Sequence, residues 1–448
     1  MSESARTYIS ESYSSAWVLL TASVTRRPPD EIEVITLPLR AASPDRCALI
    51  EDVHNRLGLR PYSHLFAICL CGALAFLDLY STQPLLPLLS GIFHASETSA
   101  SITISAATLG VAITAVALSV FGERLNRKGT IIASTFALAA VTALAATAPT
   151  LRALNMWRLL QGILTPGIFI ITIAYITEEW AAHLVPRVMS LYVAGTVFGG
   201  CVGRIAGGEL AELYNWRLMF VVLSLVSAIG AAIAQRLLKP SNAHLAHHPS
   251  RLAPMLGNLR NPRLLVTFGI GFCILFMQVA LFDYITFYLA APPFHLSTAE
   301  LSWIFAVYLI GLVATLMAGT VLLRIGLFAG LISALALGVL GVAATLLPSL
   351  TVIIIGLALA CSGVFISQTC TNSFLREAAP RGSRVSAAGM YTCFYYAGGT
   401  IGGVLPGLIW KYAAWPGCVA TICGFLLVAA ALAFFGWRKK PSPVAVSG

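Results

Sequence analysis

Apolar residues occur along the chain in blocks of about 20, and short polar stretches separate the blocks. A block of that length crosses a bilayer as a helix, whereas a membrane β-barrel shows alternating segments of about 10 residues. The pattern therefore predicts an all-α membrane protein with twelve transmembrane helices. The predicted spans lie near 64–90, 97–121, 130–149, 155–177, 186–208, 216–236, 264–289, 300–323, 327–347, 351–374, 384–410 and 414–437.

The composition supports a membrane protein and argues against nucleic acid as a partner. Of the 448 residues, 58% are hydrophobic and 10% are charged, whereas a soluble domain carries about 25% charged residues. The basic residues lie mostly in short gaps between apolar blocks rather than clustered on one soluble face, so nucleic acid is not an expected partner. All ten cysteines except Cys47 fall within or beside apolar blocks, and we interpret them as small buried residues.

The distribution of basic residues predicts the orientation, because positively charged loops stay in the cytoplasm. With a cytoplasmic N-terminus, the inner loops and the C-terminal tail hold 16 of the 21 basic residues beyond residue 63, and the outer loops hold three. Both termini are therefore expected in the cytoplasm. The expected divisions are a disordered tail (1–63), two six-helix halves (64–236 and 264–437), a linker (237–263) and a second tail (438–448).

The two halves carry matching residues at nearly constant separations, which indicates a duplication. Three residues after the second span recur after the eighth at an offset of 197, and six residues in and after the fifth span recur in and after the eleventh at an offset of 199. Parallel repeats of this kind place a substrate site between them near the membrane midplane. The pairs are Gly122/Gly319, Arg127/Arg324, Gly129/Gly326, Tyr192/Tyr391, Gly199/Gly398, Gly200/Gly399, Gly203/Gly402, Gly208/Gly407 and Trp216/Trp415.

Several motifs resemble those of the major facilitator superfamily. G-E-R-L-N-R-K-G (122–129) is similar to its loop signature G-x-L-x-D-R-x-G-R-R, and R-L-L-Q-G (158–162) to its R-x-x-Q-G element. Segments 80–87, 195–204, 291–294 and 395–403 resemble the bacterial YnfM-like exporters in particular. The resemblance covers about residues 64–437 and implies a secondary transporter that works by alternating access.

The resemblance also implies roles for particular residues. Gly122, Arg127 and Gly129 match the gating loop, in which Asn126 stands where the superfamily usually has aspartate. Arg158 matches an arginine linked to proton transfer. A glycine-rich fifth span followed by proline marks antiporters, and Gly200 occupies the proline position here, so the export direction rests on the subfamily resemblance.

Two carboxylates lie well inside the predicted spans, Asp78 in the first and Asp283 in the seventh. An acid at the bilayer centre costs roughly 2.5–3.5 kcal/mol, so it is rare without a partner or an aqueous cavity. We predict that at least one acid couples transport to protons or recognises substrate charge, with Asp283 contributing less because it lies nearer the outer end of its span. The alternative is a neutral, hydrogen-bonded structural residue. Helical spacing further predicts that Asp78, Ser81 and Thr82 form one polar stripe facing a cavity.

The buried cations and the glycines have structural alternatives. Arg158 lies about one turn from the outer end of its span, where it could instead snorkel to the surface. Arg204 is interpreted as a tie between helices. Close helix packing accounts for the glycines of the fifth and eleventh spans, namely Gly199, Gly200, Gly203, Gly398, Gly399, Gly402 and Gly403.

Polar and amphipathic side chains in four spans are candidates to line an otherwise apolar binding cavity. They are Tyr80, Gln83, Gln278, Tyr284, Tyr288, Gln368, Tyr395 and Tyr396. The histidines of the linker, His244, His247 and His248, have no nearby cysteine or acid and are interpreted as a solvated loop rather than a metal site.

These features predict a monomeric inner-membrane transporter that exports an apolar or amphipathic small molecule in exchange for protons. The expected partners are the substrate, protons and membrane lipid, and no cofactor is expected. Proton-coupled uptake of a small metabolite is the alternative within the same class. A membrane-embedded enzyme should cluster acids or histidines at one interface, and a sensor should carry a folded soluble domain, so both are minor alternatives.

Overall fold

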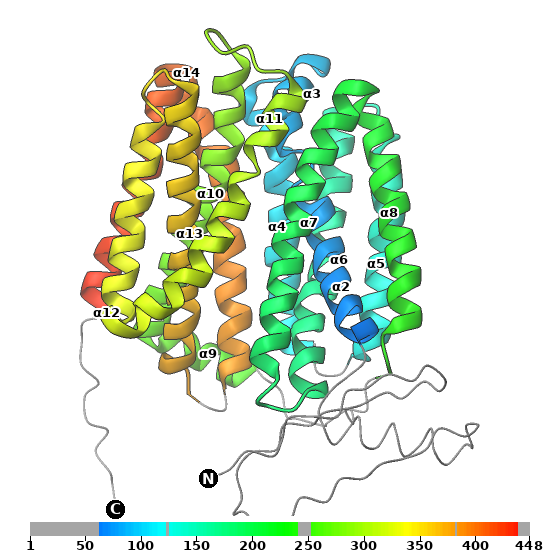
Figure 1. Ribbon diagram of the computed structural model, residues 1–448, viewed down its shortest axis with the longest axis vertical. Coiled ribbons are helices and arrows are strands. Elements are labelled where there is room, and N and C mark those ends of the chain that lie inside the picture. Colours follow the sequence, from blue (N-terminus) through cyan, green and yellow to red (C-terminus); the bar gives the residue numbers. More distant parts are fainter. Residues whose placement is uncertain (1–61, 122–124, 241–251, 381–382, 438–448) are drawn as a thin grey trace, which may run out of the picture. The chain divides into compact units, whose positions relative to one another are not determined.

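The computed structural model describes residues 62–121, 125–240, 252–380 and 383–437. These residues belong to one compact unit, Arg60–Gly448, in which every described secondary-structure element is a helix (Figure 1). The predicted disordered tail, the histidine cluster and the C-terminal tail lie outside the described residues.

The described helices follow the predicted spans closely. Their bounds are α2 (Tyr62–Leu79), η1 (Gln83–Leu85), α3 (Leu86–Ile92), α4 (Glu97–Phe121), α5 (Arg127–Ala145), α6 (Leu151–Glu179), α7 (Val185–Leu213), α8 (Trp216–Leu237), α9 (Leu252–Arg260), α10 (Pro262–Ala290), α11 (Thr298–Ile304), α12 (Val307–Ala344), α13 (Leu350–Ala378) and α14 (Arg384–Trp437).

Two long helices each contain a non-helical residue that divides them into two spans. α12 breaks at Gly326, with φ 81° and ψ 163°, and α14 breaks at Ala414, with φ 44° and ψ −142°. Together with the short apolar helix Thr298–Ala314, these divisions bring the spans of the described residues to the twelve that the sequence predicts.

The first span is interrupted, which the sequence analysis did not predict. α2 ends at Leu79, Tyr80–Thr82 form a turn, and the chain continues through η1 and α3. Pro84 and Pro87 lie at the starts of η1 and α3, where the missing N–H of proline is tolerated. The predicted stripe of Asp78, Ser81 and Thr82 is therefore wrong, because the three residues do not share one continuous helix.

Large apolar side chains remain exposed on the faces of many helices. Ile229 is 60% exposed, Leu340 is 65% exposed and Phe435 is 71% exposed. Such side chains are costly in water but suit a hydrocarbon solvent, in which backbone groups must be satisfied within helices. The nine cysteines of the described residues are free, and three of them (Cys69, Cys393 and Cys423) are half-buried rather than buried.

The same glycine contact occurs in both halves. A Cβ on Gly199 of α7 would overlap the backbone of Ala73 in α2, and one on Gly398 of α14 would overlap the backbone of Phe272 in α10. Ala73 and Phe272 are separated by 199 residues, as are the two glycines. The offset detected in sequence thus relates both partners of the contact, and it extends to Gly203 on Leu77 and Gly402 on Phe276.

Gly199→Ala is expected to destabilise the folded protein, because the added methyl group meets backbone rather than a side chain that can move away. Overpacking of this kind costs about 1–3 kcal/mol or more. Gly424→Ala is the matched control, since a Cβ there meets no atom within 4 Å. Thermal unfolding of the purified variants measures the difference, and equal stability of the two would contradict this packing argument.

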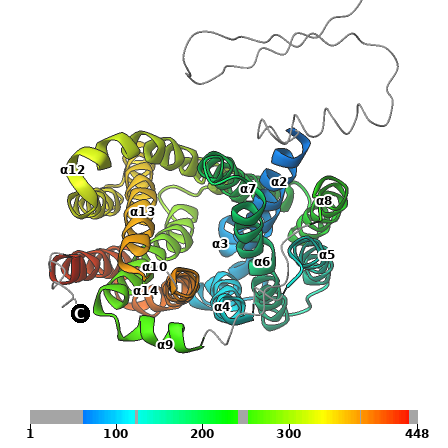
Figure 2. The same cartoon turned by 90° about the horizontal axis from the view of Figure 1, so that it is seen from below.

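The most extensive contacts between the halves are made by two helix pairs. α4 packs against α14 from Thr98 beside Gly407 to Ser119 beside Gly389, and α7 packs against α11, with Gly208 on Ser302. Figure 2 shows α4 beside α14. Hydrogen bonds cross both contacts, from Trp303 Nε1 to Glu209 Oε1 at 2.8 Å and from Ser105 Oγ to the Thr400 carbonyl at 2.9 Å.

The region predicted as a linker includes α9. Asn258 of this helix is buried and donates from Nδ2 to the Ser383 carbonyl at 3.3 Å. The end of the linker is therefore attached to the helices of the C-terminal half.

Candidate functional site

Asp78 lies in the last turn of α2 and faces the interior of the N-terminal half. Its side chain is 1% exposed, and its Oδ2 accepts a hydrogen bond from Ser227 Oγ of α8 at 2.9 Å. The other carboxylate oxygen, Oδ1, has no hydrogen-bond partner among the described residues. Asp78 therefore does not face the other half, but it presents one free oxygen in a buried site.

Arg158 of α6 binds the end of the interrupted helix. Its Nη1 donates to the Asp78 backbone carbonyl at 2.9 Å, and its Nη2 donates to the Leu79 carbonyl. Nε donates to the Thr103 carbonyl at 3.2 Å, and Nη1 also donates to Gln161 Oε1 at 2.6 Å. A helix end has unsatisfied carbonyls, so the guanidinium supplies donors where the interruption of the first span removes them.

The burial of Arg158 bears on one of its two sequence-based alternatives, snorkelling. The residue is 0% exposed, which excludes snorkelling to the surface. Gln161, from the same R-L-L-Q-G motif, continues the network by donating from Nε2 to Thr142 Oγ1 at 2.7 Å. Among the described residues, no ion pair joins the Arg158 guanidinium to the Asp78 carboxylate.

Asp283 of α10 is bound entirely by the opposite half. Its Oδ1 accepts from Gln83 Nε2 of η1 at 2.8 Å, and its Oδ2 accepts from Ser101 Oγ of α4 at 2.5 Å. The carboxylate is 0% exposed. A single acid of the C-terminal half therefore ties together two elements of the N-terminal half.

Gln83 connects Asp283 to Arg204. Arg204 Nε donates to Gln83 Oε1 at 2.7 Å, and Nη1 donates to the Gly200 carbonyl of its own helix, also at 2.7 Å. The amide thus accepts from the cation on one side and donates to the anion on the other. We call Arg204, Gln83, Asp283 and Ser101 the amide relay.

Aromatic rings from both halves surround the Arg204 guanidinium. Its Cζ lies 4.6 Å from the ring centre of Tyr80, 4.6 Å from that of Tyr308 and 5.2 Å from that of Phe305. Cation–π contacts of this kind strengthen when they are desolvated. Arg204 therefore ties α7 to η1 and also meets two rings of the C-terminal half.

Gln278 contacts Tyr308, one of the aromatic residues around Arg204. Its Nε2 donates to Tyr308 Oη at 3.1 Å, and its Oε1 accepts from Tyr395 Oη at 3.5 Å. Tyr395 also meets the ring of Tyr396 at 5.6 Å, and Tyr396 meets Phe169 of α6 at 6.1 Å. These side chains come from both halves.

Three of the predicted lining residues have other surroundings. Tyr284 donates to the Gly403 carbonyl at 2.7 Å and lies near Trp410. Tyr288 stacks on Trp415 within the C-terminal half, with ring centres 5.6 Å apart. Gln368 of α13 is half-buried, and its side chain makes no hydrogen bond to Gln278, Tyr308 or Tyr395 among the described residues.

The described part of the predicted gating loop is bound within the N-terminal half. Arg127 forms an ion pair with Glu178 at the end of α6, with Nη2 and Oε1 separated by 2.6 Å. Asn126, in the position where the superfamily usually has aspartate, caps α5 by accepting from the Gly129 N–H at 3.0 Å. Gly122 lies outside the described residues.

Three further predicted packing glycines border the site. A Cβ on Gly403 would overlap Ser105 Oγ and would lie 3.4 Å from Asp283 Oδ2, so this glycine leaves room for the carboxylate. One on Gly200 would meet Arg204 Nη1 at 3.1 Å, and one on Gly399 would meet Leu275.

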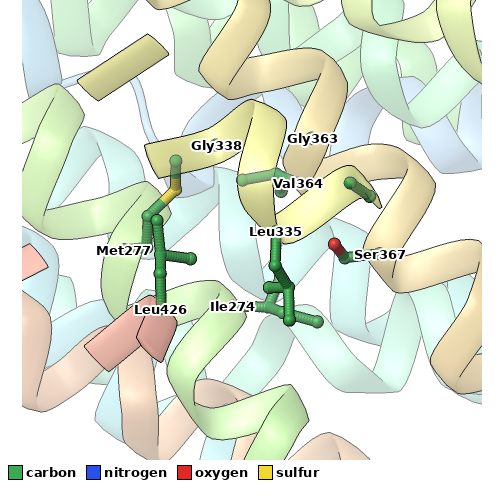
Figure 3. A pocket seen from close by; sticks show the side chains of 9 residues that line it. Ile274, Met277, Leu335, Gly338, Gly363, Val364, Ser367 and Leu426 are labelled. Carbon is green, nitrogen blue, oxygen red and sulfur yellow. The ribbon is translucent and has the colours of Figure 1, made fainter. Parts of the chain in front are cut away.

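A small cavity lies elsewhere, inside the C-terminal half. Ile274, Met277, Leu335, Val364 and Leu426 line it, and Figure 3 shows the Ser367 hydroxyl turned toward them. Ser367 Oγ has no hydrogen-bond partner among the described residues. The cavity lies between helices of one half, away from the amide relay.

Sequence reasoning missed Ser101, Ser227, Phe305 and Tyr308. Serine is common in membrane helices, where its hydroxyl can hydrogen-bond to the backbone of its own helix. No sequence pattern therefore distinguished the two serines that bind carboxylates. Tyr308 carried the same signal as the tyrosines that were selected, an amphipathic side chain inside a predicted span, and it could have been included on that basis.

Comparisons with known proteins agree with this architecture. The Major Facilitator Superfamily pattern matches residues 68–403. An uncharacterized MFS-type transporter of Bacillus subtilis, YybF, is 31% identical over 382 residues, which cover 84% of this chain and 94% of the relative. The Escherichia coli inner membrane transport protein YnfM is 30% identical over 367 residues, covering 81% of this chain and 88% of that protein.

Solved structures give the same fold at low sequence identity. A bacterial homolog of the human lysosomal transporter Spinster, inward-facing and unoccupied, superposes with a TM-score of 0.70 at 16% identity, covering 86% of this chain and all of that one. A mutant of the nucleoside transporter NupG gives 0.68 at 15% identity, covering 84% of this chain and all of that one. The chain therefore belongs to the major facilitator superfamily and is a multi-pass secondary transporter rather than an enzyme.

Proposed function

We propose that the protein exports apolar or amphipathic small molecules across the bacterial inner membrane in exchange for protons. The proposed orientation places both termini in the cytoplasm, on the basis of the unequal distribution of basic residues between loops. Similarity to an inner membrane transport protein supports the compartment.

The observation that carries the proposal is the bonding of Asp283 across the two halves. An ionised carboxylate accepts hydrogen bonds from both Gln83 Nε2 and Ser101 Oγ. A protonated carboxyl must use one oxygen as a donor, and the Ser101 hydroxyl can accept that hydrogen whereas the amide NH2 of Gln83 cannot. Proton binding at Asp283 is therefore expected to fall on Oδ2 and to reverse the hydrogen bond with Ser101 at the contact between the halves, and a ligand that favours one arrangement shifts the equilibrium between them.

Asp78 is the second protonation site that we propose. Its unpartnered Oδ1 can hold a proton without breaking the hydrogen bond from Ser227 to Oδ2. Arg158 holds the backbone at the same point, so a change at Asp78 reaches the turn that leads to Gln83. We propose Asp78 as the proton carrier and Asp283 as the acid that connects protonation to movement of the halves.

The side chains between the halves support the proposed substrate class. Tyr80, Tyr308, Tyr395 and Tyr396 present rings with polar ends, and Gln278 is the amide among them. Sites with mostly aromatic walls and a few polar groups suit amphipathic ligands.

A susceptibility panel in a host that lacks its own exporters tests this function. Expression of the wild-type chain is expected to raise tolerance to amphipathic toxic compounds, and dissipating the proton gradient should remove that tolerance. Expression of Asp78→Asn at equal membrane levels is the matched control. Unchanged tolerance together with restored growth on a single nutrient would favour proton-coupled uptake instead.

A further inference from the structure

We propose that the free edge of the Arg204 guanidinium binds the anionic group of the transported molecule, so that the preferred substrates are amphipathic organic anions. This inference rests on the proposed function for its site, but it adds the charge of the ligand. The juxtaposition that carries it is a buried cation with an unused donor edge among rings of both halves.

The two buried arginines differ in how fully their donors are used. Arg158 makes four hydrogen bonds, which involve all three of its side-chain nitrogens. Arg204 makes two, and its Nη2 donates to no described residue. A guanidinium carries five N–H donors in a planar fork that matches a carboxylate. Arg158 is therefore satisfied by the protein, whereas Arg204 retains capacity for a ligand.

The amide relay leaves the remaining N–H donors of Arg204 available for a ligand. Gln83 stands between Arg204 and Asp283, so the nearest bonded carboxylate is reached through an amide and not by a direct ion pair. A direct pair would occupy the fork of the guanidinium, as Glu178 does with both Nε and Nη2 of Arg127. A buried cation without such a partner is stabilised by any anion that reaches it.

The aromatic residues around Arg204 favour a particular kind of ligand body next to the anionic group. Tyr80 comes from the N-terminal half, and Phe305 and Tyr308 come from the C-terminal half, so a ligand body beside Arg204 contacts both. The rings and the fork together suit a carboxylate or sulfonate attached to an apolar or aromatic body. An anion that leaves a cytoplasm with negative potential also moves in the direction that the potential favours.

Ligand-induced thermal stabilisation of the purified full chain tests the charge preference. The probes share one ring system and differ in charge: 2-naphthoate, 2-naphthamide and 2-naphthylmethylamine. Wild type is expected to be half-maximally stabilised by 2-naphthoate at a concentration about tenfold lower than by the amide, with the amine weakest. Arg204→Gln should remove the difference between naphthoate and naphthamide. Arg152→Gln, at an exposed arginine near the start of α6, should leave it unchanged.

Arg204→Lys provides a second variant that keeps the charge but loses the planar fork, and it should reduce the preference without abolishing it. If Arg204→Gln does not fold, the wild-type preference and its reduction in Arg204→Lys decide the question. No preference for naphthoate in wild type, or a full preference in either Arg204 variant, overturns the proposal. The readout is equilibrium binding, so it stands whether or not transport proves to be proton-coupled or outward.

Discussion

Asp78→Asn is expected to abolish substrate flux driven by a pH gradient while leaving the amount of folded protein nearly unchanged. Asparagine keeps an oxygen that can accept from Ser227 Oγ, which lies 2.9 Å from Asp78 Oδ2 in the wild type. Its NH2 takes the place of Oδ1, where the protonated acid would also carry a donor. The variant therefore imitates the protonated state permanently and cannot release a proton.

The measurement is substrate accumulation in everted vesicles with an imposed acid-inside gradient, normalised to inserted protein. Ser227→Ala is the matched control, because it removes the hydrogen bond but keeps the titratable group. It should retain most of the gradient-driven flux. Full gradient-driven transport by Asp78→Asn would show that Asp78 is not the carrier.

Asp283→Asn serves as a comparison in the same vesicles. An asparagine oxygen can still accept from Gln83, and its NH2 can donate to Ser101 Oγ, so the contact between the halves persists in one fixed form. This variant is expected to be milder than Asp78→Asn, with altered apparent affinity for substrate more than loss of coupling.

Arg158→Met is expected to lose most of the folded protein, a larger structural effect than any substitution at Arg204. Removing the guanidinium takes away the donors for the Asp78 and Leu79 carbonyls at the interrupted end of α2. Leaving a buried acceptor without its donor costs about 1–3 kcal/mol for each group. The Gln161 side chain also loses its donor, which loosens its link to Thr142.

Size-exclusion profiles of fluorescently tagged protein compare Arg158→Met with Arg204→Met at equal expression. The second variant is the control because Arg204 donates to a single backbone carbonyl, that of Gly200 in its own helix. A monodisperse Arg158→Met protein that binds substrate but has lost coupling would instead favour the proton-transfer role that the family resemblance implies.

The spans were predictable from sequence because each must be long and apolar enough to cross a bilayer, whatever its neighbours are. The interruption at Tyr80–Thr82 was not predicted, although Pro84 and Pro87 follow it. Proline is tolerated in membrane helices when neighbouring groups satisfy the freed backbone. Arg158 is such a neighbour, and it lies 80 residues from Asp78 along the chain.

The candidate site was partly predictable for a related reason. Polar residues inside apolar spans, such as Asp78, Asp283 and Gln83, can be recognised from the sequence because burying them in a membrane costs free energy. Their partners cannot be recognised in this way, since Ser101 and Ser227 are residue types that are ordinary in membrane helices, and only the fold places a carboxylate beside them. The orientation of Asp78 toward α8, rather than toward the opposite half, depends on where α2 ends.

The single-residue joint at Gly326 limits how the C-terminal half can deform. The two spans of α12 meet there with no intervening loop, and the φ of 81° is one that glycine adopts without strain. Ala414 forms a similar joint in α14. Each pair of spans is thus a hairpin with no slack, in which one arm cannot slide along its axis without pulling the other. A movement of one arm of such a hairpin along its axis would therefore displace the other arm as well.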